Sequence, residues 1–121
     1  MNWWRSSWFI LLGVIAYLSL KPASSINLVE VNDKVGHFLA YFTLFIATYI
    51  FFPKWKIKGA ALFSLAWSIT MELLQNFSPG RTVSIFDVFA NAAGILIGVI
   101  FYLMFQKWIK ILLIKLRIVN K

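Results

Sequence analysis

Four long runs of apolar residues, separated by short polar connections, limit what this chain can fold into. They cover residues 6–20, 35–52, 59–77 and 85–105. A helix rises about 1.5 Å per residue, so a run of about 20 residues crosses a hydrocarbon layer about 30 Å thick. We therefore predict an all-α integral membrane bundle of four transmembrane helices, forming a single domain over residues 1–121.

The composition agrees with burial in lipid. Hydrophobic residues make up 61% of the chain and charged residues only 13%, whereas a soluble domain is about half apolar and about a quarter charged. The chain has no cysteine, which excludes a disulfide, a thiolate nucleophile and a cysteine-ligated metal. We expect membrane lipids to be partners.

The first run has two interpretations. Arg5 before an apolar run, with Ala23-Ser24-Ser25 after it, fits a cleaved secretory signal peptide. We prefer an uncleaved first span, because Trp3, Trp4 and Trp8 favour anchoring at the membrane interface and three further runs follow.

The basic residues orient the chain. The formal net charge is +8, but the cations lie at the ends of apolar runs, which argues against nucleic-acid binding. With four spans and both termini inside, nine basic residues face the cytoplasm, namely Arg5, Lys54, Lys56, Lys58, Lys107, Lys110, Lys115, Arg117 and Lys121. Three lie outside, namely Lys21, Lys34 and Arg81. This bias predicts that both termini are cytoplasmic.

The basic tail, residues 107–121, alternates lysine and arginine with isoleucine and leucine. This pattern is typical of an amphipathic helix lying in the membrane interface. A charged stop-transfer tail remains an equal alternative.

Polar residues recur at helical spacing in three of the four runs. Residues three or four positions apart share a helix face. The second run has Asp33, His37 and Tyr41, the third has Ser68, Glu72, Gln75 and Asn76, and the fourth has Asp87, Asn91, Gly94 and Gly98. Because these stripes lie at the same outer depth, we expect them to face one another.

Glu72 lies about 7–8 Å below the end of its run, by helix rise. A charged residue at the centre of a membrane helix costs about 2.5–3.5 kcal/mol on insertion scales, so such residues are normally paired. We expect partners among Lys34, His37 and Arg81. Either Glu72–Arg81 and Asp87–Lys34 are ion pairs that only fix the bundle, or the residues line a functional pocket.

His37 and the glycine pair each allow two readings. A lone histidine on an apolar helix is usually a hydrogen-bonded structural residue, but beside Asp33 and Glu72 it could act as a proton acceptor or metal ligand. We assign no metal site and expect no cofactor. Gly94 and Gly98 form a GxxxG motif, which we interpret as an intramolecular helix contact rather than a dimer interface. A homo-oligomer is left open.

The polar motifs follow one another between residues 33 and 98. They are Asp33-Lys34-Val35-Gly36-His37 with Tyr41, Glu72-Leu73-Leu74-Gln75, Pro79-Gly80-Arg81-Thr82, Asp87, Asn91, Gly94 and Gly98. In this order and spacing the chain resembles VanZ-like membrane proteins. The resemblance implies a small multi-span protein of the bacterial cytoplasmic membrane, in a family without an established biochemical activity. The founding member is associated with teicoplanin resistance, a phenotype that we do not carry over.

We predict a cell-envelope protein with an outward-facing polar site for a lipid-linked envelope precursor or an amphiphilic or glycopeptide antibiotic. The expected ligand-binding residues are Asp33, Lys34, His37, Tyr41, Glu72, Gln75, Arg81, Asp87 and Asn91. One alternative is a small proton-coupled transporter. Another is an intramembrane enzyme acting on a lipid-linked substrate, with Glu72 or His37 as general base; Ser78, Thr82 and Ser84 lie in no recognisable nucleophile motif, so we favour binding over catalysis.

Overall fold

The computed structural model describes residues 3–20, 30–77 and 85–116. Within these ranges the chain forms four α-helices and no strand, in the order α1 (Trp3–Leu20), α2 (Glu30–Phe51), α3 (Lys56–Gln75) and α4 (Ile85–Lys115). A short 3-10 helix, η2 (Pro53–Trp55), joins α2 to α3. The all-α prediction is confirmed.

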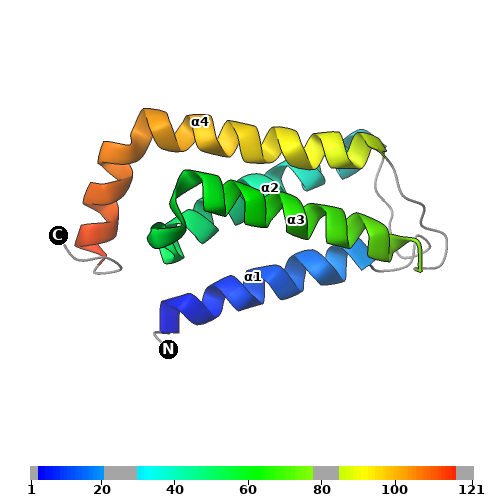
Figure 1. Cartoon of the computed structure of the whole chain (residues 1–121), viewed down its shortest axis with the longest axis horizontal. Helices are drawn as coiled ribbons and strands as arrows, with labels where there is room; N and C mark the ends of the chain where they lie inside the picture. The colour runs from blue at the N-terminus through cyan, green and yellow to red at the C-terminus, as the bar shows by residue number, and fades with distance from the viewer. Residues whose placement is uncertain (1–2, 21–29, 78–84, 117–121) are drawn as a thin grey trace.

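The four helices run back and forth beside one another (Figure 1). The beginning of α1, the connection η2 and the end of α4 lie at one end of the molecule, and the beginnings of α2 and α4 lie at the other. The contact between α2 and α4 is the most extensive, and α1 packs on α2 and α3. Three helices therefore meet at the end that carries the polar motifs.

Two helical stretches have the length and apolar composition needed to cross a membrane, Pro53–Gln75 and Ile85–Lys115. Two shorter apolar helices accompany them, Arg5–Leu20 and Val35–Phe51. Two candidate spans are thus present in the described residues. The four-span arrangement remains a prediction.

The fourth helix continues past the predicted end of its membrane span. It does not stop near Phe105 but continues to Lys115, so the described part of the basic tail is an extension of α4 rather than a separate helix. The reason lies in the sequence, because residues 99–115 contain no glycine or proline to end the helix. Figure 1 shows that this C-terminal part bends away from the direction of the rest of α4.

The first helix docks through Trp8, which is buried rather than exposed at the surface. Its indole Nε1 donates a hydrogen bond of 2.9 Å to Thr48 Oγ1 on α2, and its ring contacts the rings of Phe52 and Phe63. The interpretation of Trp8 as an interfacial anchor was therefore wrong. The residue joins α1 to the bundle.

Close contact between α2 and α4 depends on Gly94 and Gly98. A Cβ atom added to Gly94 would overlap the backbone carbonyl oxygen of Phe38, and one added to Gly98 would lie 2.9 Å from the ring of Phe45. The structure thus places both glycines in an intramolecular contact. The contact lies beside His37 and Tyr41 on α2 and about one turn after Asn91 on α4.

Candidate functional site

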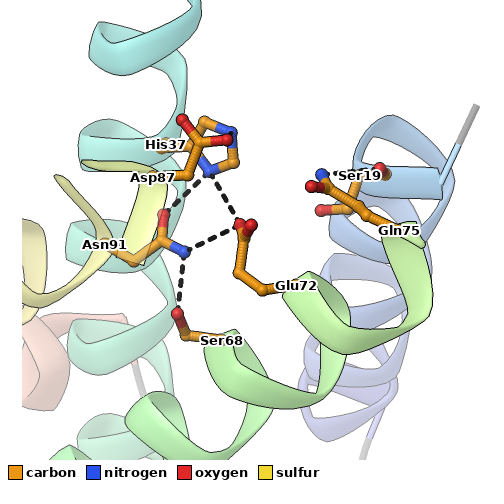
Figure 2. Close-up of polar contacts among 7 residues, drawn as sticks. All are labelled: Ser19, His37, Ser68, Glu72, Gln75, Asp87 and Asn91. Carbon is orange, nitrogen blue, oxygen red and sulfur yellow. Dashed lines mark hydrogen bonds and ion pairs between the residues drawn. The ribbon is translucent and has the colours of Figure 1, made fainter. Parts of the chain in front are cut away.

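Each of three helices contributes one pair of polar residues, spaced four apart, to a common buried site. We call this group the polar cluster; it consists of His37 and Tyr41 from α2, Ser68 and Glu72 from α3, and Asp87 and Asn91 from α4. Figure 2 shows five of these side chains converging from the three helices. All six are at most 9% exposed. The cluster is therefore withdrawn from the surface.

Asn91 connects the three helices. Its Nδ2 donates to Ser68 Oγ at 2.7 Å and lies 3.5 Å from Glu72 Oε1. Its Oδ1 lies 2.9 Å from Nδ1 of His37 (Figure 2). Since a carboxylate only accepts hydrogen bonds, the amide nitrogen belongs on the Glu72 side and the amide oxygen on the His37 side.

This arrangement determines the tautomer of a neutral His37. Because Asn91 Oδ1 can only accept, Nδ1 of the imidazole must carry the hydrogen and donate it. The second nitrogen, Nε2, then keeps its lone pair and lies 3.8 Å from Asp87 Oδ2. Nε2 therefore presents a basic atom next to a carboxylate.

Both carboxylates of the polar cluster lie near the imidazole. Glu72 Oε1 is 3.8 Å from His37 Nδ1, and one ligand atom each from His37, Glu72 and Asp87 falls within 4.8 Å of the others. Asp87 stands in the first turn of α4, where the helix dipole favours a negative charge. Two acidic groups and one imidazole thus converge on one small volume.

Tyr41 closes the cluster on the side of α2. It is only 1% exposed, and its phenol group lies close to Glu72 and Ser68. The phenol oxygen makes no hydrogen bond of good geometry with the described residues. A buried hydroxyl normally has a partner, so this group is available to a ligand.

Gln75, which was expected to join the site, faces another helix. Its Nε2 donates a hydrogen bond of 2.8 Å to the backbone oxygen of Ser19 on α1 (Figure 2). Asn76, on the same predicted stripe, is exposed. Gln75 lies one turn of α3 beyond Glu72 and points away from the polar cluster. It therefore bonds α3 to α1 and does not contribute to the site.

Three expected site residues lie partly or wholly outside the described structure. Asp33 and Lys34 belong to α2, but their side chains are outside the described part, and Arg81 is outside it altogether. The predicted ion pairs Glu72–Arg81 and Asp87–Lys34 therefore remain predictions.

Sequence reasoning did not find the specific contacts inside the cluster. Ser68 was noted only as part of a stripe, yet it accepts the short bond from Asn91. The spacing of four in each helix indicated which residues share a face. Their partners depend on how each helix is rotated about its axis, which spacing does not determine.

Comparison with known proteins gives a family match. A sequence model of the VanZ/LLP1 family matches residues 3–106. An uncharacterised protein of the fission yeast Schizosaccharomyces pombe is 30% identical over 102 residues, which cover 81% of this chain and 61% of the yeast protein. The chain thus spans less than two thirds of that relative's length. No solved structure matches the chain.

Proposed function

The chain belongs to the VanZ/LLP1 family, and from this premise we propose that it is a four-span membrane protein whose polar cluster binds the polar headgroup of an amphiphile taken from the bilayer. The observation that carries this proposal is the convergence of His37, Glu72 and Asp87 at one buried point between three helices.

The distribution of side chains supports the membrane setting. Large apolar residues of α4 point outward, including Phe86, Phe89, Leu96 and Met104, while the polar residues Asp87 and Asn91 of the same helix point inward. Single exposed apolar residues are common in soluble proteins, but large apolar side chains along the length of a helix are typical of a surface that contacts lipid. This apolar outer surface is stable in contact with lipid.

Energetic cost supports a ligand site over simple helix association. Membrane helices associate well through small residues and single polar contacts, and Gly94 already supplies such a contact between α2 and α4. Burying two carboxylates and an imidazole adds a cost of about 2.5–3.5 kcal/mol for each charged group on insertion scales. Interactions with a bound headgroup would offset this cost of burial.

The residues towards the opposite end of the bundle count against a transporter. Ser64 Oγ donates to the backbone oxygen of Ala60 on its own helix, and Thr48 accepts the hydrogen bond from Trp8. Both are fully buried and already bonded within the protein. They support a site closed at its inner end rather than a polar path across the membrane.

The class of ligand is inferred from the polar cluster and from the occurrence of a similar protein in yeast. An envelope precursor or a glycopeptide antibiotic would restrict the site to bacterial chemistry, whereas a similar protein exists in a yeast. We therefore favour a membrane lipid with a polar headgroup. The envelope location, in a bacterial plasma membrane with both termini in the cytoplasm, is part of the proposal.

Native mass spectrometry of the protein purified in mild detergent tests this function. We expect the wild type to retain a headgroup lipid and Glu72→Gln to lose it, because the neutral amide removes the charge but keeps the size. Ser64→Ala is the matched control, since it removes a buried hydroxyl of the same helix outside the polar cluster. Equal lipid retention by all three proteins, or by none, would contradict the proposal.

A further inference from the structure

We propose that His37, Glu72 and Asp87 form a binding site for one divalent transition-metal cation, Zn²⁺ or Mn²⁺. The three residues come from α2, α3 and α4, so the ion would join the three helices at the polar end of the bundle. This inference concerns the same polar cluster as the proposed function, but it does not require that a lipid binds there.

The spacing of the ligand atoms fits one ion. Zinc lies about 2.0–2.1 Å from an imidazole nitrogen and about 2.0–2.2 Å from a carboxylate oxygen. His37 Nε2 and Asp87 Oδ2 are 3.8 Å apart, slightly less than the sum of these two distances, so an ion between them contacts both. At 3.8 Å these two atoms are too far apart for a direct hydrogen bond.

Glu72 is the third candidate ligand, and its Oε1 lies 3.8 Å from Nδ1 of the same imidazole. One atom each of His37, Glu72 and Asp87 falls within 4.8 Å of the others. Imidazole suits zinc, and carboxylates suit manganese and other hard cations. One nitrogen and two oxygen donors therefore favour a divalent ion that accepts both imidazole and carboxylate ligands. Three protein ligands leave coordination positions open for water or a headgroup oxygen.

Asn91 supplies the support that such a site needs. A metal-bound histidine usually donates its other ring N–H to an acceptor, which holds the ring and fixes the tautomer. Nδ1 of His37 donates to Asn91 Oδ1 at 2.9 Å, which leaves Nε2 as the nitrogen that binds the ion. Asn91 Nδ2 at the same time approaches Glu72 Oε1 at 3.5 Å, so one amide orients two ligands.

A second, independent observation at the site is the Tyr41 phenol. It is nearly fully buried and lies close to Glu72 and Ser68, but its oxygen makes no hydrogen bond of good geometry with the described residues. A water molecule on the ion would supply this hydroxyl with a partner. The cation also balances charge, because it carries two positive charges into a volume that holds two carboxylates.

Metal titration of the purified full chain tests the site. The protein carries an affinity tag without histidine, is stripped with a chelator in detergent, and is titrated with ZnCl₂ and separately with MnCl₂ under equilibrium dialysis. No lipid is added. We expect one ion per chain for at least one of the two metals, and at least a tenfold loss of affinity in Glu72→Gln and in Asp87→Asn.

Two further variants separate a metal site from a merely folded bundle. Asn91→Ala keeps all three ligands, and loss of such a supporting group is expected to weaken metal affinity by about 10–100-fold. Ser64→Ala, outside the polar cluster, is expected to bind like the wild type. Each variant is first shown to elute as a single species in size-exclusion chromatography. X-ray absorption of the zinc-loaded wild type should show only nitrogen and oxygen ligands.

Fewer than about one ion per ten chains in the wild type would overturn the inference. So would equal binding in wild type and in the variant that combines His37→Gln, Glu72→Gln and Asp87→Asn. Lipid retention is measured on the same preparations. Cation binding without retention of a headgroup lipid would overturn the proposed function alone. Lipid retention without cation binding would overturn the cation site alone.

Discussion

Asn91 lies on α4, but its amide bonds to residues of α2 and α3. This single side chain orients the imidazole of His37 and contacts Glu72. The sequence placed Asn91 one turn after Asp87 and indicated that both face inward. It did not reveal these bonds, because the depth and rotation of the neighbouring helices decide which side chains an amide reaches.

Replacing Asn91 by leucine is expected to destabilise the bundle. Interhelical hydrogen bonds in membranes average about 0.6 kcal/mol and reach about 1.7 kcal/mol, so loss of the two short bonds should lower the free energy of unfolding by about 1–3 kcal/mol. The measurement is reversible unfolding in mixed micelles, followed by circular dichroism. Ser64→Ala, whose hydroxyl bonds only within α3, should change it by less. Equal decreases in the free energy of unfolding of the two variants would show that the interhelical bonds of Asn91 do not stabilise the bundle.

Two elements show what periodicity predicts and what it misses. The apolar runs 35–52 and 59–77 predicted the bodies of α2 and α3, which begin five and three residues earlier and end one and two residues earlier, because hydropathy marks the apolar part of a helix and not its polar first turn. A helix in the basic tail was one of two predictions, but its continuity with α4 was not predicted, although residues 99–115 contain no glycine or proline. Trp8 was misplaced for a related reason, because an indole suits both a membrane interface and a buried contact with a hydroxyl such as Thr48.

The approach of α2 to α4 should depend on the absence of a side chain at Gly94. Gly94→Ala places a methyl group against the carbonyl oxygen of Phe38, and overpacking of this kind costs about 1–3 kcal/mol. Gly13→Ala is the control, since nothing lies within 4 Å of a Cβ added there. We expect a lower unfolding midpoint for Gly94→Ala and little change for Gly13→Ala. A stable Gly94→Ala protein with an intact polar cluster would contradict the close packing.

At the scale of the whole molecule, the order of the helices predicts topology. The start of α1, η2 and the end of α4 lie together at one end (Figure 1), and this end carries the lysines of the η2 region and of α4. For the proposed four-span arrangement, the positive-inside rule predicts that this end is cytoplasmic. In that topology the polar cluster would lie nearer the outer leaflet.

Cysteine labelling tests this topology, because the chain has no cysteine of its own. Single variants Lys54→Cys, Lys107→Cys and Phe77→Cys place a thiol at exposed positions. In intact cells a membrane-impermeant reagent should label only Phe77→Cys, and all three should react after permeabilisation. Labelling of Lys54→Cys or Lys107→Cys in intact cells would show that the orientation is reversed or that the four-span arrangement is wrong.

The polar cluster is proposed to be a ligand site and not only a set of ion pairs that fixes the bundle. The most direct test is the free energy of unfolding of lipid-stripped and chelator-stripped protein, wild type against the double variant Glu72→Gln with Asp87→Asn. If the carboxylates serve a ligand, neutral side chains of the same size relieve their burial, and the variant should be at least as stable as the wild type. Breaking buried ion pairs would instead cost about 3–5 kcal/mol, and a loss of that size would contradict the account.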